Sequence, residues 1–206
     1  AGLLKISVLI RRQPHPILTV SIMKAVVVVL AVLLLSAAIA RQNHDQYTVE
    51  ASRGNGSCSA GWRITGYYTP IEADFTTKDT REVQINGVGK ETFNADFLNT
   101  IFSENEGFGE GWGKTRFGWY LGKYDGGWHK SDAPLDAHDK PLQPDTVAVD
   151  NAVIPAGSVV TIPDLPGDLG KLKFKSDDVG VSVHGKHIDV YTGEGSEARR
   201  RMYLFT

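Results

Sequence analysis

Three aspartates in the last third of this 206-residue chain are the residues best suited to do chemistry. Asp150 ends the run 147–150 (VAVD), Asp178 lies in 177–180 (DDVG), and Asp189 lies in 187–191 (HIDVY). Each adjoins β-branched residues, which favour strands, so each is expected in a strand or at a strand end. Carboxyl groups held close together disfavour each other's ionisation, so one of them can keep a proton and act as a general acid.

The same residues allow two other interpretations. Aspartate is common in turns at strand ends, where its carboxylate caps backbone N–H groups and has no further role. Three aspartates could also bind a metal ion together with His184 and His187. Two residues three apart on a strand point to opposite faces, and the spacing is not that of a known zinc motif. We therefore expect no metal site and no other cofactor.

Four short motifs surround the aspartates in a fixed order: AVD at 148–150, IPAG at 154–157, DVG at 178–180 and IDVY at 188–191. Together they resemble the three-aspartate (3D) domain of peptidoglycan-cleaving lytic transglycosylases. The relatives are of the membrane-bound lytic murein transglycosylase A type and the smaller stationary-phase muralytic proteins. The match runs from about residue 147 to 195, with weaker matches back to residue 65. The resemblance implies an all-β fold, a six-stranded double-psi β-barrel.

The resemblance also implies roles for the aspartates. Asp178 would be the catalytic residue, and Asp150 and Asp189 would orient it and contact the sugar. The reaction would cleave the β-1,4 bond between N-acetylmuramic acid and N-acetylglucosamine. Most glycosidases need a second carboxyl group to activate water or to act as nucleophile. A lytic transglycosylase can use one, because the C6 hydroxyl group of the same sugar attacks the anomeric carbon and closes a 1,6-anhydro ring.

Two other segments resemble parts of the glycan groove of the same family. The segment 65–70 (TGYYTP) places Thr65, Tyr67 and Tyr68 as substrate-binding residues, since tyrosine offers a flat apolar face and a hydroxyl group. The segment 111–118 (GWGKTRFG) adds Trp112 and Gly113, and the matched pattern resumes at Lys186, which we include as a substrate contact. The alternative is that these aromatic residues only pack in the core.

The pattern departs from the family at two positions. Val181 stands where the relatives have a second glycine, and His184 stands where they have a lysine. A β-branched residue resists a positive φ, so the local turn is expected to differ. Two other functions therefore stay open on the same barrel. One is an expansin-like module that binds wall polysaccharide without cutting it, and the other is a β-glucan hydrolase.

Many short strands separated by glycine and proline turns, with little helical periodicity, independently favour an all-β barrel or sandwich. Residues 62–70 and 82–85 are predicted strands, and short helical segments and loops are expected to decorate the barrel. One helix is predicted over 94–102, from the spacing of its apolar residues. Another is predicted over 196–202, with Ser196 as its N-cap.

The N-terminal part of the sequence predicts secretion. Residues 23–40 combine a basic start, an apolar core and a small-residue end, which is typical of a signal peptide cleaved after Ala40. Residues 1–22 look like a non-native upstream extension, and residues 41–60 look like a flexible leader before a barrel domain over 61–206. We expect a secreted or periplasmic protein that leaves the membrane once the signal is cleaved.

Composition narrows the class of partner. The whole chain has 22 basic and 24 acidic residues, and four of the basic residues precede residue 41, which leaves a formal charge of −6 on residues 41–206. A mildly acidic surface argues against a nucleic-acid partner. The expected partner is the glycan strand of peptidoglycan, bound by a monomer. The single cysteine, Cys58, excludes an internal disulfide.

Overall fold

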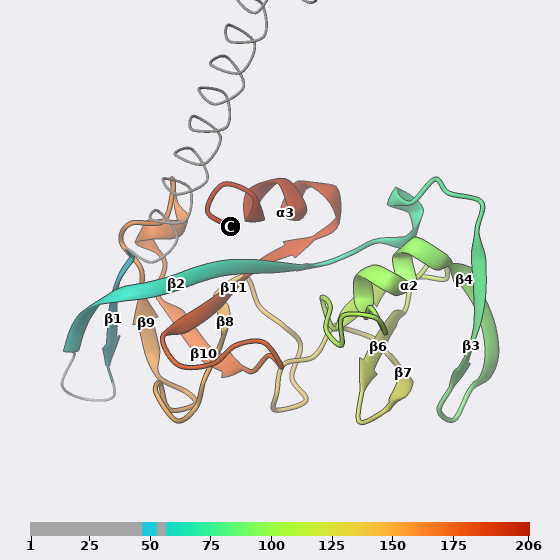
Figure 1. Ribbon diagram of the computed structural model, residues 1–206, viewed down its shortest axis with the longest axis horizontal. Coiled ribbons are helices and arrows are strands. Elements are labelled where there is room, and N and C mark those ends of the chain that lie inside the picture. Colours follow the sequence, from blue (N-terminus) through green and yellow to red (C-terminus); the bar gives the residue numbers. More distant parts are fainter. Residues whose placement is uncertain (1–46, 53–56) are drawn as a thin grey trace, which may run out of the picture. The chain divides into compact units, whose positions relative to one another are not determined.

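The computed structural model describes residues 47–52 and 57–206, so the expected upstream extension and signal peptide lie outside the described residues. No helix in the described part is long and apolar enough to cross a membrane. Figure 1 shows the elements in chain order.

Six strands close into a barrel in the order β1-β2-β11-β8-β10-β9 (Figure 1). Two neighbouring pairs, β11 with β2 and β10 with β8, are parallel, and the other pairs are antiparallel. Parallel neighbours far apart in sequence need crossover connections, so this barrel is not a simple meander. The closed barrel confirms the predicted all-β class and the six-stranded double-psi architecture. The strands are β1 (Tyr47–Ser52), β2 (Ser57–Thr69), β8 (Thr146–Val149), β9 (Val159–Thr161), β10 (Phe174–Asp178) and β11 (His187–Glu194).

The barrel interior is filled by aliphatic and aromatic side chains from all six strands. All four residues of β8 are buried, as expected for a strand with a neighbour on each side and both faces covered. Fully buried side chains include Ile64, Val147, Phe174 and Ile188. These residues form a rigid support for the carboxyl groups at the strand ends.

Within the predicted flexible leader 41–60, the described residues 47–52 and 57–60 form strands. Residues 47–52 form β1, and β2 begins at Ser57, so both strands belong to the barrel. The reason is visible in the alternation of Tyr47, Val49 and Ala51, which pack against the barrel core. Cys58 lies on β2 as an exposed free thiol.

A second, five-stranded sheet is inserted between β2 and β8, where one strand at 82–85, a short helix and loop decorations were expected. Its order is β4-β3-β7-β6-β5, and it has its own core, in which Ile85, Phe93, Phe97 and Leu121 are fully buried. The strand β2 has 13 residues and runs from the barrel toward this sheet (Figure 1). The strands are β3 (Thr80–Ile85), β4 (Gly89–Asn94), β5 (Trp112–Lys114), β6 (Tyr120–Tyr124) and β7 (Gly127–Ser131).

The two predicted helices are present. Helix α2 (Ala95–Ile101) begins at Asn94, whose side chain accepts hydrogen bonds from the N–H groups of Asp96 and Phe97. Helix α3 (Gly195–Met202) begins one residue earlier than predicted, so Ser196 lies inside it and Glu194 occupies the cap position. The Glu194 side chain instead accepts from the Tyr120 hydroxyl group at 2.7 Å, which ties the barrel to the second sheet. Two short 3-10 turns complete the fold, η2 (Glu72–Asp74) and η3 (Leu169–Lys171).

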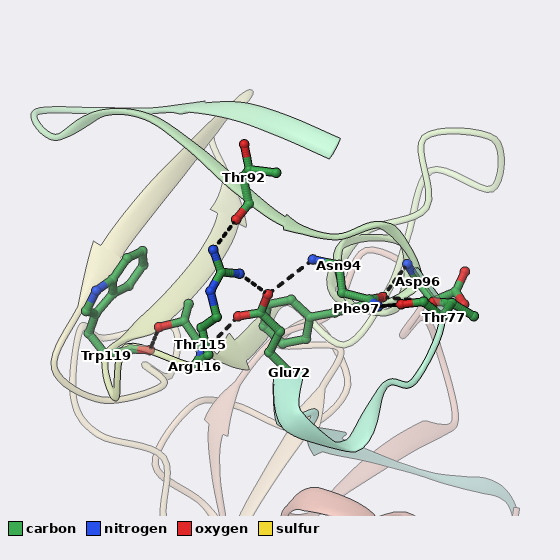
Figure 2. Close-up of polar contacts among 9 residues, drawn as sticks. All are labelled: Glu72, Thr77, Thr92, Asn94, Asp96, Phe97, Thr115, Arg116 and Trp119. Carbon is green, nitrogen blue, oxygen red and sulfur yellow. Dashed lines mark hydrogen bonds and ion pairs between the residues drawn. The ribbon is translucent and has the colours of Figure 1, made fainter. Parts of the chain in front are cut away.

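The buried carboxylate of Glu72 holds the chain where it leaves the barrel (Figure 2). It accepts hydrogen bonds from the backbone N–H groups of Asn94 and Arg116, at 3.1 and 2.9 Å, and from the Arg116 guanidinium group. Arg116 also donates to the carbonyl oxygen of Thr92 at 2.7 Å. A buried charge is tolerated when it is paired and hydrogen-bonded, as this one is, so we assign Glu72 a structural role.

Candidate functional site

A cavity of about 770 Å³ is bounded by residues of the barrel and of the second sheet. The barrel supplies Tyr67 from β2, Ala148 from β8, Asp178 from β10 and Asp189 from β11. The insertion supplies residues 107–112, the hairpin turn around Asp125 and the loop around Asp136. Two of the three aspartates singled out by the sequence therefore line one cavity.

Asp178 and Asp189 lie on the two strands that flank β8. The register pairs Ala148 with Asp178 on one side and with Asp189 on the other. A methyl group is therefore the only side chain that β8 places between the two carboxyl groups at this level. Ala148 lines the cavity together with both aspartates.

The Asp178 carboxyl group is held by hydrogen bonds from a side chain and from the backbone. Tyr67 donates its hydroxyl proton to Oδ2 at 2.6 Å, and the backbone N–H of Val179 donates to Oδ1 at 2.9 Å. Burial raises the pKa of Asp178, and the charge of Asp136 adds to this, while the hydrogen bonds from Tyr67, from the N–H of Val179 and from the N–H of Ala137 lower it. The predicted cause was repulsion from Asp150 and Asp189, but burial is the main cause here, and the charge that contributes is that of Asp136. A carboxyl group held this way is suited to give and take a proton.

Asp189 is connected to a buried histidine by the Thr65 hydroxyl group. Thr65 Oγ1 lies 2.7 Å from Asp189 Oδ1 and 2.8 Å from His187 Nε2, and His187 Nδ1 lies 3.2 Å from the carbonyl oxygen of Ser182. Thr65 has one hydroxyl proton and cannot donate to both neighbours, so the protonation of Asp189 is linked to the proton positions on His187. Burial raises the pKa of Asp189 to about 6 and lowers the pKa of His187.

Asp150 is not brought to the cavity. Its Oδ1 accepts from the N–H of Ala152 at 2.9 Å, and its Oδ2 accepts from the N–H of Gly185 at 2.8 Å. The bond from Gly185 is the main reason that the pKa of Asp150 is lowered. The carboxylate thus connects the turn after β8 to the loop that leads into β11. Because β11 carries Asp189, this connection also helps to position Asp189.

The predicted substrate-binding residues divide into three groups. Tyr67 and Trp112 line the cavity. Thr65 reaches it only through Asp189. The other three lie among different neighbours: Tyr68 packs against Ala198 and Met202, Lys186 donates to the carbonyl oxygen of Ala60 at 2.8 Å, and Gly113 is buried in the second sheet.

Gly113 is small for a packing reason. A Cβ atom there would lie 2.6 Å from both Ile101 Cδ1 and Phe97 Cε2, well inside contact distance. The residue that its strand presents to the cavity is Trp112, which packs its ring against Tyr124 at 5.7 Å between centroids.

Sequence reasoning missed four acidic residues of the cavity lining, Glu110, Asp125, Asp136 and Asp139. Glu110 lies between two glycines, and its carboxyl group accepts from the N–H of Tyr68 at 2.8 Å. Asp136 lies in a polar loop and faces Asp178 closely enough to raise its pKa. The sequence carried a weak signal for Glu110, since a charged residue inside the run GEGWG is unusual for a loop that must pack. It carried none for Asp136.

Within residues 47–52 and 57–206, no group of three or more His, Cys, Asp and Glu side chains is arranged to hold a metal ion. His184 is exposed in the loop before β11, whereas His187 is the buried first residue of that strand, so the two do not share a strand as the prediction assumed.

Comparison with known proteins identifies part of this barrel. Residues 145–202 match the family model of the 3D domain. No curated protein matches the chain. A crystal structure of MltA from Escherichia coli with bound chitohexaose is 15% identical, with 69% of this chain and 68% of that chain covered and a TM-score of 0.48. Another MltA structure, described as a unique lytic transglycosylase fold, is 13% identical over 68% and 67% of the two chains, with a TM-score of 0.44. Residues 145–202, which hold Asp150, Asp178 and Asp189, therefore match the 3D domain family that the frame of three aspartates predicted.

Proposed function

We propose that this protein is a secreted or periplasmic peptidoglycan lytic transglycosylase that uses Asp178 as its acid and base. The observation that carries the proposal is the pairing of Asp178 and Asp189 across Ala148 in one cavity. In this cavity, the Asp178 carboxyl group is partly buried and has a raised pKa. The Asp189 carboxyl group accepts a hydrogen bond from the Thr65 hydroxyl group. The 3D domain supports the assignment to glycan chemistry.

The first step is transfer of a proton from Asp178 to the glycosidic oxygen. The bond between the anomeric carbon of N-acetylmuramic acid and that oxygen then breaks, and N-acetylglucosamine leaves as an alcohol. The positive charge that develops on the anomeric carbon is stabilised by the negative charge of Asp178, and of Asp189 when it is ionised. The Tyr67 hydroxyl group keeps Asp178 Oδ2 in one position throughout.

In the second step, the Asp178 carboxylate removes a proton from the C6 hydroxyl group of the same sugar. The C6 oxygen forms a bond to the anomeric carbon and closes the 1,6-anhydro ring, so no water molecule is consumed. Attack within one molecule is favoured by proximity, by roughly 7–11 kcal/mol in the best-oriented cases. Asp178 is protonated again at the end, so a single carboxyl group completes the cycle.

Asp150 acts as a positioning residue in this scheme. Its bonds to Ala152 and Gly185 hold the loops at the ends of β8 and before β11. Because β8 and β11 carry Ala148 and Asp189, loss of these bonds would loosen the carboxyl pair without removing the acid.

The test is mass spectrometry of purified peptidoglycan after incubation with the protein. Wild type is expected to release muropeptides one water lighter than hydrolysis products, and Asp178→Asn is expected to release none. Asp177→Asn is the matched control, because it changes the neighbouring residue on the same strand. Fragments with reducing ends would instead indicate a hydrolase. Sedimentation of both proteins with the wall material, without any fragments, would indicate an expansin-like binding module.

A further inference from the structure

Glu110 is a cavity residue for which the proposed mechanism has no use. Its backbone N–H donates to the carbonyl oxygen of Thr100 at 3.0 Å, and the N–H of Gly111 donates to that of Ile101 at 3.0 Å. The flanking glycines make this possible. A Cβ atom at Gly109 would lie 2.4 Å from the Ile101 carbonyl oxygen, and Gly111 has φ +80°. The segment is thus held against the end of α2, and Glu110 projects from a fixed point.

The two oxygens of the Glu110 carboxyl group have different surroundings. Oε2 accepts from the backbone N–H of Tyr68 at 2.8 Å. Oε1 has no hydrogen-bond partner among the described residues. It is not a buried unpaired atom either, because in the described part of the chain the one such side-chain atom belongs to Arg81. Oε1 is therefore open to the cavity, whose lining Glu110 shares with Phe108 and Trp112.

The charges around Glu110 favour its neutral form. No basic side chain in the described residues lies within ion-pair distance of it. The pKa of Glu110 is raised to about 8, mainly by burial and to a lesser extent by the charge of Asp189, against the lowering effects of the hydrogen bond from the Tyr68 N–H and of the charge of Arg199 on α3. The other charged residues that line the cavity are Asp125, Asp136, Asp139, Asp178 and Lys123. At neutral pH the open oxygen is therefore a hydroxyl donor.

We propose that Glu110 binds the acetamido group of an N-acetylated sugar, with its carboxyl O–H donating to the acetamido carbonyl oxygen. That carbonyl oxygen is the strongest uncharged acceptor on an amino-sugar strand, and the neighbouring aromatic rings offer an apolar contact for the acetamido methyl group. A site that donates to one ligand group discriminates against an analogue that lacks it. Glu110 is thus a specificity-determining residue, and this inference rests on the proposed glycan function.

The experiment compares the binding of chitohexaose, which has acetamido groups, with that of cellohexaose, which has hydroxyl groups at the same positions. All proteins carry Asp178→Asn, so that the ligand stays intact and Asp178 does not titrate. Calorimetry is run between pH 7 and 9.5, above the range in which Asp189 titrates. Glu110→Gln keeps a donor, Glu110→Ala removes it, and Glu106→Gln is a control on the exposed neighbouring loop.

We expect the protein with Glu110 intact and the Glu110→Gln variant to bind chitohexaose more tightly than cellohexaose at pH 7. In Glu110→Ala we expect this preference to fall by about tenfold. With Glu110, the preference is expected to decline above about pH 8 as the donor proton is lost, whereas with glutamine it stays constant. An unchanged preference in Glu110→Ala overturns this inference alone. Failure of both sugars to bind to any of these proteins overturns the proposed function as well.

Discussion

Tyr67 and Asp178 lie on strands that are not neighbours in the barrel, yet the tyrosine hydroxyl group donates to the carboxylate at 2.6 Å. Two strands, β11 and β8, separate β2 from β10. The bond therefore spans the end of the barrel over the position of Ala148. It fixes the direction of Asp178, and it lowers a pKa that burial raises.

The first prediction concerns this bond. Tyr67→Phe removes a donor that stabilises the ionised form, so the pKa of Asp178 should rise further. If Asp178 is the acid, the alkaline limb of the pH–rate profile moves to higher pH, and the maximal rate falls by about tenfold as the carboxyl group loses its orientation. The profile is measured by release of soluble muropeptides.

Tyr191→Phe is the matched control for that experiment. Its ring packs against Tyr67 at 5.2 Å, but its hydroxyl group bonds to Thr69 at 2.9 Å, away from Asp178. A limb that shifts equally in both variants, or in neither, would show that the Tyr67 hydroxyl group does not control the protonation of Asp178.

The bridge between Asp189 and His187 gives the second prediction. Thr65→Val removes the hydroxyl group that bonds to both residues. Because that bond lowers the pKa of Asp189, the pKa should rise above its present value of about 6. Carboxyl and imidazole titrations by NMR measure both groups. Thr69→Val, which removes a buried hydroxyl group from the same strand, should leave both titrations unchanged.

The sequence predicted the barrel better than it predicted the site. The β-branched runs around 147–149 and 188–190 are core strands, and their register alone brings Asp178 and Asp189 together. Asp150 was grouped with them because sequence spacing does not reveal that its oxygens are used by Ala152 and Gly185. Of the second sheet, only the strand at 82–85 was predicted, because the other four strands contain glycine and looked like loops. Glu110 was missed, since its environment depends on how that sheet meets the barrel.

The third prediction separates Asp150 from Asp178. Asp150→Asn should lower activity by less than about tenfold, whereas Asp178→Asn should lower it by roughly a hundredfold to ten-thousandfold. The pKa of Asp150 is lowered in the folded protein, so its contribution to stability is present above the unfolded pKa and is lost as pH falls through the folded one. Thermal unfolding at pH 7 and pH 3 should show a destabilised variant at pH 7 and a smaller difference at pH 3. Equal loss of activity in the two variants would place Asp150 in the catalytic step.

The fourth prediction tests the packing role of Gly113. Gly113→Ala should destabilise the protein by about 1–3 kcal/mol, because the new methyl group meets Ile101 and Phe97 at 2.6 Å. Adding Ile101→Val removes one of the clashing atoms and should recover part of the loss. Denaturant unfolding measures both variants. If Gly113→Ala is as stable as wild type and loses only glycan binding, the groove role inferred from the sequence is the better explanation.

The last prediction uses the effect of Glu110 on stability. Its pKa is about 8 in the folded protein against 4.5 in the unfolded chain, so between these values the folded state binds more protons. Stability must therefore fall as pH rises from about 4.5 to 8, and it should change no further from this group above that range. Glu110→Gln is neutral in both states, and it should be more stable than wild type at pH 8 by roughly 1–3 kcal/mol. Denaturant unfolding at pH 5 and pH 8 measures the difference, with Glu106→Gln as the exposed control. If wild type and Glu110→Gln lose the same stability between the two pH values, Glu110 is ionised in the folded protein, and the donor that it offers to the acetamido group does not exist.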